Sequence, residues 1–153
     1  MKQRKLIYAA IVSVLAGALA AAAQEKGDWM AESSTAKSIT GDVAFSTYKI
    51  AINFSSYTIA QIRELEPNEI KAAFDAENPA PRSGNLYRLD IPATKHFVHH
   101  NTLCGSQDTQ WVATWVSGRS LQLAFFSGEK MPVFTPDAIA NSTNLCGTFS
   151  YAR

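Results

Sequence analysis

The sequence has 153 residues, of which 46% are apolar and 18% are charged, and its formal net charge is +1. Once residues 1–23 are set aside as a targeting segment, Lys2, Arg4 and Lys5 leave with them, and 14 basic against 13 acidic residues become 11 against 13, a formal charge of −2. The rest of the chain is too short for a multidomain enzyme, too apolar for a disordered chain and too acidic for a domain that binds nucleic acid.

Residues 1–23 have the layout of a secretory signal peptide. A basic start, Met1–Lys5, precedes a mainly apolar stretch that ends in the small residues Ala20–Ala23, and the polar Gln24 follows. This layout predicts cleavage near Ala23 and leaves residues 24–153 as a single exported domain, periplasmic or secreted. Because the apolar stretch ends in alanines that are followed by charged residues, a permanent membrane anchor is not expected.

The first part of the exported domain shows strand patterns after a polar opening, which we expect to be a mobile terminus until a strand begins near Trp29. Four large apolar residues then alternate with small or polar ones, so we expect them on one face of a strand: Tyr48, Ile50, Ile52 and Phe54. The phase of the pattern changes at Ser46-Thr47, which indicates a turn or bulge there. A further strand is expected over residues 57–63.

Residues 66–76 change to a helical period. Pro67 suits the first turn of a helix, and three apolar residues then share one helical face: Ile70, Ala73 and Phe74. Two prolines end the helix and begin an irregular stretch, Asn78–Asn85, which we expect to be an exposed loop. A strand over residues 86–91 follows, with Tyr87 among its inward residues.

The clearest hairpin runs over residues 111–126, with Ser117-Gly118-Arg119 as its turn. We expect one face of this hairpin to carry six apolar side chains: Trp111, Ala113, Trp115, Leu121, Leu123 and Phe125. Residues 136–140 suit a single helical turn after Thr135, and residues 146–151 suit a final strand. Seven or eight short strands and one or two short helices predict a mainly β domain, a small antiparallel barrel or, as the alternative, a β-sandwich.

The chain has two cysteines, Cys104 and Cys146. In an exported chain an even pair of this kind favours a structural disulfide, and closing a loop of 42 residues stabilises a fold by about 4 kcal/mol on the chain-entropy model. Similar sequences surround both residues, so we expect two neighbouring strand starts held in register by the bridge.

All three histidines lie close together in the sequence, at His96, His99 and His100. On a helix they would share one face and suit a zinc or copper ion, whereas on a strand His99 would point away from the other two. The flanking Phe97-Val98 favours extended structure, which would separate the rings. Metal binding by this cluster is therefore an alternative hypothesis.

We expect no enzymatic activity and no cofactor, because the common motifs of hydrolases, metalloproteases, phosphate-binding loops and thiol redox proteins are missing from the sequence. The exposed Asn78–Asn85 loop is the expected binding region, since exposed connections often carry function. Its polar contacts would come from Arg82, Asn85 and Arg88. Trp111 and Trp115 would add an apolar surface and, if they line a cavity, a site for a small apolar ligand.

Several short stretches together resemble a group of small exported β-proteins of proteobacteria: Ser38–Asp42, Tyr87–Leu89, Asn101–Gly105, Ala124–Gly128 and Leu145–Phe149. The expected architecture is also similar to that of periplasmic barrels that inhibit lysozymes or proteases, and to lipocalin-like barrels. This resemblance implies a non-enzymatic periplasmic binding module that acts on a protein or a small apolar ligand. A metal-binding envelope protein and a structural or stress factor of the envelope are the alternatives.

Overall fold

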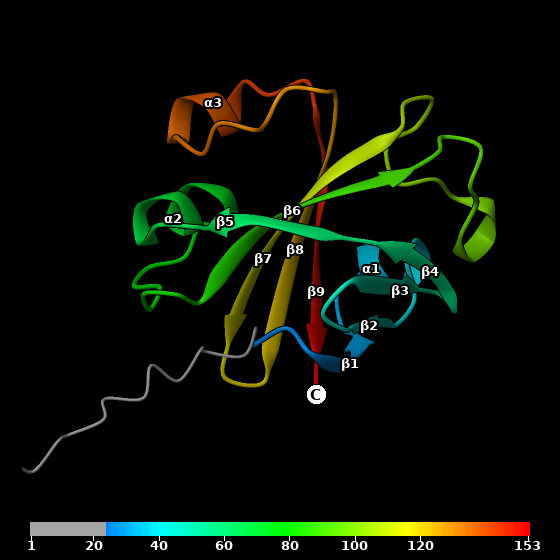
Figure 1. Ribbon diagram of the computed structural model, residues 1–153, viewed down its shortest axis with the longest axis horizontal. Helices are drawn as coiled ribbons and strands as arrows, with labels where there is room; N and C mark the ends of the chain where they lie inside the picture. Colours follow the sequence, from blue (N-terminus) through cyan, green and yellow to red (C-terminus); the bar gives the residue numbers. More distant parts are fainter. Residues whose placement is uncertain (1–23) are drawn as a thin grey trace, which may run out of the picture.

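Nine antiparallel strands form one continuous sheet in the computed structural model, which describes residues 24–153 (Figure 1). The strands are β1 (Gly27–Ala31), β2 (Val43–Phe45), β3 (Lys49–Ile52), β4 (Ser55–Thr58), β5 (Ala60–Glu64), β6 (Gly84–Ile91), β7 (Thr109–Ser117), β8 (Ser120–Ser127) and β9 (Leu145–Ala152). The helices are α1 (Ser34–Ser38), α2 (Pro67–Phe74), α3 (Pro136–Ala140) and the short 3₁₀ turn η1 (Val98–His100). The predicted signal peptide lies outside the described residues. No helix within residues 24–153 is long and apolar enough to cross a membrane.

The strand order is β4-β3-β2-β1-β9-β8-β7-β6-β5. The first and last strands of the chain are therefore neighbours, and Met30 of β1 stands opposite Ala152 of β9. The two edge strands, β4 and β5, follow each other in the chain with Ile59 between them. Hydrogen bonds do not join these edges, so the predicted closed barrel is not confirmed, and the strands form one sheet rather than the two sheets of a sandwich.

The inner face of the curved sheet holds the main hydrophobic core. Alternation along each strand places every second side chain there, as the pleat requires. The largest fully buried members are Trp29, Ile50, Ile52, Phe125, Phe149 and Tyr151. Aromatic rings fill the centre, with Phe125 and Phe149 in an edge-to-face arrangement at 5.4 Å between centroids.

A second core lies on the outer face of β6, β7 and β8, where α2 and α3 cover the sheet (Figure 1). The predicted helix is confirmed in α2: Glu66 and Glu69 form a capping box, Pro67 begins the helix, and its buried face holds Ile70, Ala73 and Phe74. Arg63 on β5 donates to both oxygens of Glu69 at 2.7 Å. These bonds hold the pKa of Glu69 below its usual value and tie α2 to the sheet edge.

The β7–β8 hairpin is confirmed, but the expected common face of its six apolar residues is wrong. Thr114 stands opposite Leu123, whereas Trp115 stands opposite Gln122. The tryptophans therefore face the second core and the β8 residues Leu121, Leu123 and Phe125 face the main core. The physical reason is the turn, which has two residues, Gly118 and Arg119, instead of three, so the strand phases shift by one.

Two further strand predictions differ from the structure. Tyr48 and Phe54 do not share the buried face of Ile50 and Ile52, because β3 begins at Lys49 and ends at Ile52, and both aromatic side chains are exposed. The strand expected over residues 57–63 is two strands, β4 and β5, which are separated at Ile59 and lie at opposite edges of the sheet. Within residues 24–153, nine strands and three α-helices thus exceed the numbers expected from the sequence.

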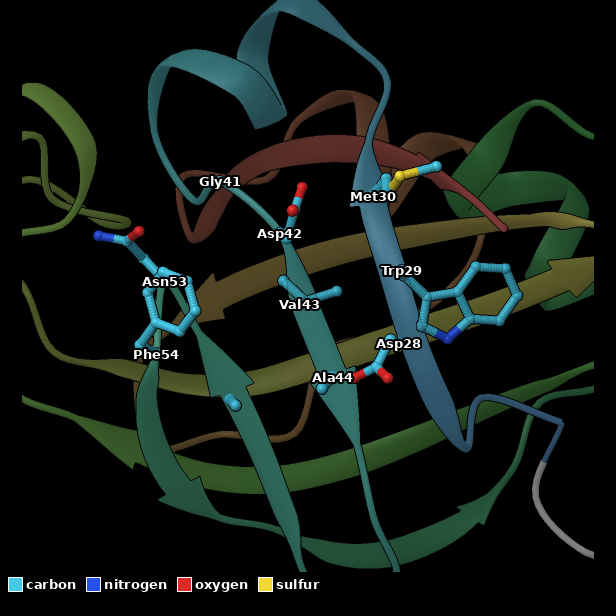
Figure 2. Close-up of a pocket in the computed structure, with 10 residues that line it drawn as sticks. Asp28, Trp29, Met30, Gly41, Asp42, Val43, Ala44, Asn53 and Phe54 are labelled. Carbon is cyan, nitrogen blue, oxygen red and sulfur yellow. The ribbon is translucent and has the colours of Figure 1, made fainter.

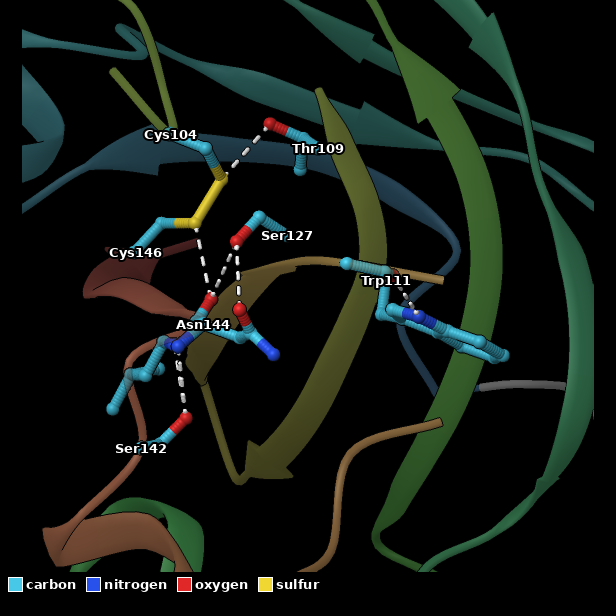
Figure 3. The surroundings of a disulfide bond; sticks show 9 residues. Cys104, Thr109, Trp111, Ser127, Ser142, Asn144 and Cys146 are labelled. Carbon is cyan, nitrogen blue, oxygen red and sulfur yellow. Dashed lines mark hydrogen bonds between the residues drawn. A yellow bond between two sulfur atoms is a disulfide. The ribbon is translucent and has the colours of Figure 1, made fainter. Parts of the chain in front are cut away.

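The predicted disulfide joins Cys104 to Cys146, with 5.0 Å between their Cα atoms. Figure 3 shows that the bridge ties the loop between β6 and β7 to the start of β9, with Thr109 and Asn144 beside its sulfur atoms. Cys146 begins a strand as expected, but Cys104 lies in a loop. The bridge therefore fastens a loop to the sheet and does not align two strand starts.

Candidate binding surface

The outer face of the sheet is covered by helices over β6–β8, whereas its β1–β3 part carries an open depression. Asp28, Ala44 and Ala51 stand side by side on this outer face, because Asp28 is opposite Ala44 and Ala44 is opposite Ala51. The two alanine side chains are short, so the surface above them is recessed relative to the larger side chains around them. The result is a hollow of about 450 Å³, here called the outer hollow, lined by Asp28, Trp29, Met30, Gly41, Asp42, Val43, Ala44, Ala51, Asn53 and Phe54.

Large apolar side chains stand on two sides of the outer hollow. Figure 2 shows Met30 on β1 and Phe54 after β3, on either side of Asp42 and Val43. Met30 is 64% exposed and Phe54 is 100% exposed. Trp29 differs from both, because its side chain is buried in the main core. An uncovered pair of this size next to a low apolar surface is typical of a contact site for another molecule.

Phe54 occupies a backbone position that normally favours glycine. It lies in the two-residue turn between β3 and β4, since Ile52 is paired with Ser55. Asn53 and Phe54 have φ angles of 45° and 67°, the signature of a type I′ hairpin turn. Asparagine tolerates this conformation, but a side chain such as that of phenylalanine destabilises it by roughly 1–2 kcal/mol. Full exposure means that no packing within the described residues offsets this cost.

The charged groups of the outer hollow are both acidic. Asp28 and Asp42 line it, and none of its ten lining residues is lysine, arginine or histidine. Asp42 is held in place because its Oδ1 accepts a hydrogen bond from the backbone N–H of Ala31 at 2.8 Å. Its backbone carbonyl also accepts from the N–H of Asn53 at 3.2 Å, which links β2 to the Phe54 turn.

All five binding residues expected from the sequence lie outside the outer hollow. The guanidinium of Arg88 stacks over the Trp111 ring at 4.6 Å, and the indole Nε1 of Trp111 donates to the carbonyl of Gly128 at 2.9 Å. Trp115 packs beside Phe74 of α2, with 6.1 Å between the ring centroids. Trp111 is therefore buried in the second core, whereas Trp115 is partly buried against it and also lines a small open hollow of about 200 Å³ with Ser117, Ser120 and Gln122.

Arg82 and Asn85 lie apart from Arg88 and the two tryptophans, and their own surroundings differ. Arg82 is exposed in the loop before β6 with a φ angle of 58°, whereas Asn85 belongs to β6 and is buried. The structure thus brings Arg88 and Trp111 together, but it does not gather the five expected binding residues into one surface.

A buried polar cluster around Glu25 was missed by sequence reasoning, which expected a mobile terminus there. Glu25 is only 1% exposed. Its Oε1 accepts hydrogen bonds from Asn85 Nδ2 at 2.7 Å and from the hydroxyl of Thr114, and its backbone carbonyl accepts from Trp29 Nε1 at 2.7 Å. Burial, together with the nearby Glu25 carboxylate, raises the pKa of Tyr87. This cluster fixes the start of the domain against β6 and β7.

The three histidines lie in a loop that ends in η1, neither on a regular helix nor on a strand. His96 Nδ1 is 2.8 Å from the carbonyl oxygen of His100, and the two ring centroids are 6.4 Å apart. His99 and His100 both have positive φ angles. Within residues 24–153, no three His, Cys, Asp or Glu side chains are arranged to hold a metal ion. The geometry therefore gives no support to the metal-binding hypothesis.

No protein-family model, curated protein or solved structure significantly matches this chain. Its function is consequently inferred from the outer hollow and the residues that line it.

Proposed function

We propose that this chain is a non-enzymatic, exported binding module that recognises a partner protein through the outer hollow. The observation that carries the proposal is Phe54, a fully exposed aromatic residue held in a left-handed turn. Strained backbone positions are found mainly where function requires the side chain. Aromatic residues, phenylalanine included, are also enriched at protein interfaces relative to the rest of the surface.

The filled interior favours a surface site over an internal ligand site. Phe125, Phe149 and Tyr151 occupy the centre of the main core, and each is almost completely buried. A lipocalin-like site would require open space at this position. Trp111 is likewise buried in the second core with Phe74 and Phe134, and the hollow beside Trp115 is small and lined mainly by polar residues, Ser117, Ser120 and Gln122. A small apolar ligand inside the sheet is therefore no longer part of the proposed function.

Site-specific photo-crosslinking in the exported fraction of the producing cells tests the proposal. A benzophenone amino acid replaces Phe54 in one variant and Val133 in the control, because Val133 is also an exposed apolar residue, 63% exposed, and does not line the outer hollow. We expect a discrete covalent adduct with one protein from position 54 and none from position 133.

A second variant links the adduct to the hollow. Ala51→Tyr places a large side chain on the outer hollow and leaves the residues of the Phe54 turn unchanged, and a position on the outer face of a strand accommodates tyrosine well. We expect the adduct from position 54 to disappear in this background while the melting temperature stays close to that of the parent. An adduct that persists, or one that forms equally from position 133, contradicts the proposal.

A further inference from the structure

We infer that the partner places an arginine or lysine side chain in the outer hollow, with the aliphatic part of that side chain on Met30, Ala44 and Ala51 and its charged head beside Asp28. This inference rests on the proposed function and names the chemistry that the hollow recognises. It follows from the charge, the shape and the openness of the site.

Charge complementarity selects a cationic group. Asp28 and Asp42 are the only charged residues among the ten that line the hollow. An acidic partner would be repelled by both carboxylates, and like charges brought together across an interface cost several kcal/mol. A neutral apolar partner would remove water from Asp28 without replacing its hydrogen bonds, which is also unfavourable. A cation is the occupant whose charge is complementary to this acidic surface.

The shape of the hollow suits a long side chain with an apolar stem. Met30, Ala44 and Ala51 offer apolar contact along the hollow. Figure 2 shows Asp28 beside Ala44 and Asp42 farther along the strands, near Met30. Lysine and arginine bury their methylene groups on apolar surfaces and keep the charged head at a polar end.

The openness of the hollow favours a side chain of a protein over a free small molecule. Small-molecule sites usually enclose most of the surface of their ligand. The outer hollow is instead a depression on one face of the sheet, and Phe54 extends fully into solvent beside it. A partner protein covers both features at once, because its surface continues beyond the inserted side chain.

The test is an NMR titration of the ¹⁵N-labelled exported protein with three acetylated and amidated peptides of sequence Gly-Leu-X-Leu-Gly. The central residue X is arginine, its uncharged isostere citrulline, or glutamate. We expect the arginine peptide to shift the amide signals of Asp28, Met30, Ala44 and Ala51 with a weak, salt-sensitive affinity. The citrulline peptide should bind more weakly, by up to about 5-fold, because an exposed ion pair contributes up to about 1 kcal/mol.

Matched charge variants locate the effect. Asp28→Asn removes one carboxylate of the outer hollow, and Glu64→Gln removes an exposed carboxylate of β5 that does not line it. Both variants change the net charge equally, but only Asp28→Asn should weaken the binding of the arginine peptide, by about 2-fold to 5-fold.

The possible results separate this inference from the proposed function. Equal binding of the arginine and citrulline peptides, or equal effects of the two variants, overturns the inference about charge. The absence of signal shifts with all three peptides also overturns it. In each case the proposed function stands or falls separately, through the crosslink from position 54 and its loss in Ala51→Tyr.

Discussion

Replacing Phe54 with glycine should make the protein more stable. In the native turn the φ angle of Phe54 is 67° and its side chain is 100% exposed, so the substitution removes backbone strain and no buried contact. Relief of a left-handed phenylalanine is worth roughly 1–2 kcal/mol. The extra freedom of glycine in the unfolded chain subtracts about 0.5–1 kcal/mol. The expected net gain in the free energy of unfolding is therefore about 0.5–1 kcal/mol.

The β7–β8 hairpin provides a mirrored control. Gly118 also lies in a two-residue turn, with a φ angle of 59°, and a methyl group added to its Cα would meet no other part of the described chain within 4 Å. Gly118→Ala should accordingly destabilise the protein through backbone strain alone. Urea denaturation of both variants measures the two changes, and the gain in Phe54→Gly corresponds to a rise of about 2–3 °C in melting temperature.

The two variants together can refute the reasoning about strain. If Gly118→Ala loses stability and Phe54→Gly does not gain it, then Phe54 stabilises its own turn. Its exposure would then need no functional explanation. If Phe54→Gly gains stability and no longer binds the partner that the benzophenone variant at position 54 identifies, the side chain is maintained for binding at the expense of the fold.

Three further predictions concern stability. Replacing both Cys104 and Cys146 with serine should lower the free energy of unfolding by about 4 kcal/mol, because the bridge closes a loop of 42 residues. Urea denaturation of the oxidised parent and of the double variant measures the difference. A loss below about 1 kcal/mol would show that the chain-entropy model fails for this bridge. Glu25→Ala should lower the free energy of unfolding by about 2–3 kcal/mol, because it leaves two buried donors without their acceptor. Glu25→Gln keeps an acceptor oxygen and should lower it by less, so equal losses in the two variants would contradict this account. Burial raises the pKa of Tyr87 and of Tyr151 above the ordinary value of 10.0. As the pH rises, the unfolded chain therefore loses these protons before the folded protein does, so the tyrosines should not affect the free energy of unfolding below pH 10 and should lower it above pH 10. Melting temperatures measured across that range, with tyrosinate absorbance followed in parallel, test this prediction, and a constant melting temperature would oppose it.

Local signals in the sequence predicted the elements that depend on local chemistry. The helix α2 was predicted because Pro67 and the spacing of its apolar residues act within a few positions. The disulfide was predicted because the cysteines are a single pair. The β7–β8 hairpin was also predicted, but not its phase, because a turn of two residues instead of three reverses which side chains face the core.

The candidate site was harder to predict because its determinants are distant in the sequence or concern the backbone. Phe54 continues an alternating apolar pattern, and only the chain reversal after Ile52 turns its side chain into solvent. The hollow requires β1 and β2 to be placed beside β3, so that Asp28 and Ala51 lie on either side of Ala44. Glu25 lies in a polar segment that is typical of an exposed chain terminus. Its burial depends on Asn85 and Thr114, which are 60 and 89 positions away.

The strand order has a consequence for how the chain could be rewired. Starting at β5, the sheet runs β5-β6-β7-β8-β9-β1-β2-β3-β4, so the fold is a circular permutation of a simple meander. Among the described strands, the one pairing between strands that are not consecutive is that of β1 with β9, and Arg153 reinforces it by donating to the carbonyl of Lys26 at 2.9 Å. A circularly permuted chain, in which a linker joins β9 to β1 and new termini are made at Ile59, would pair only strands that are consecutive in the sequence. Because such local pairings close shorter loops, the rewired chain should fold faster than the natural one while presenting the same outer hollow.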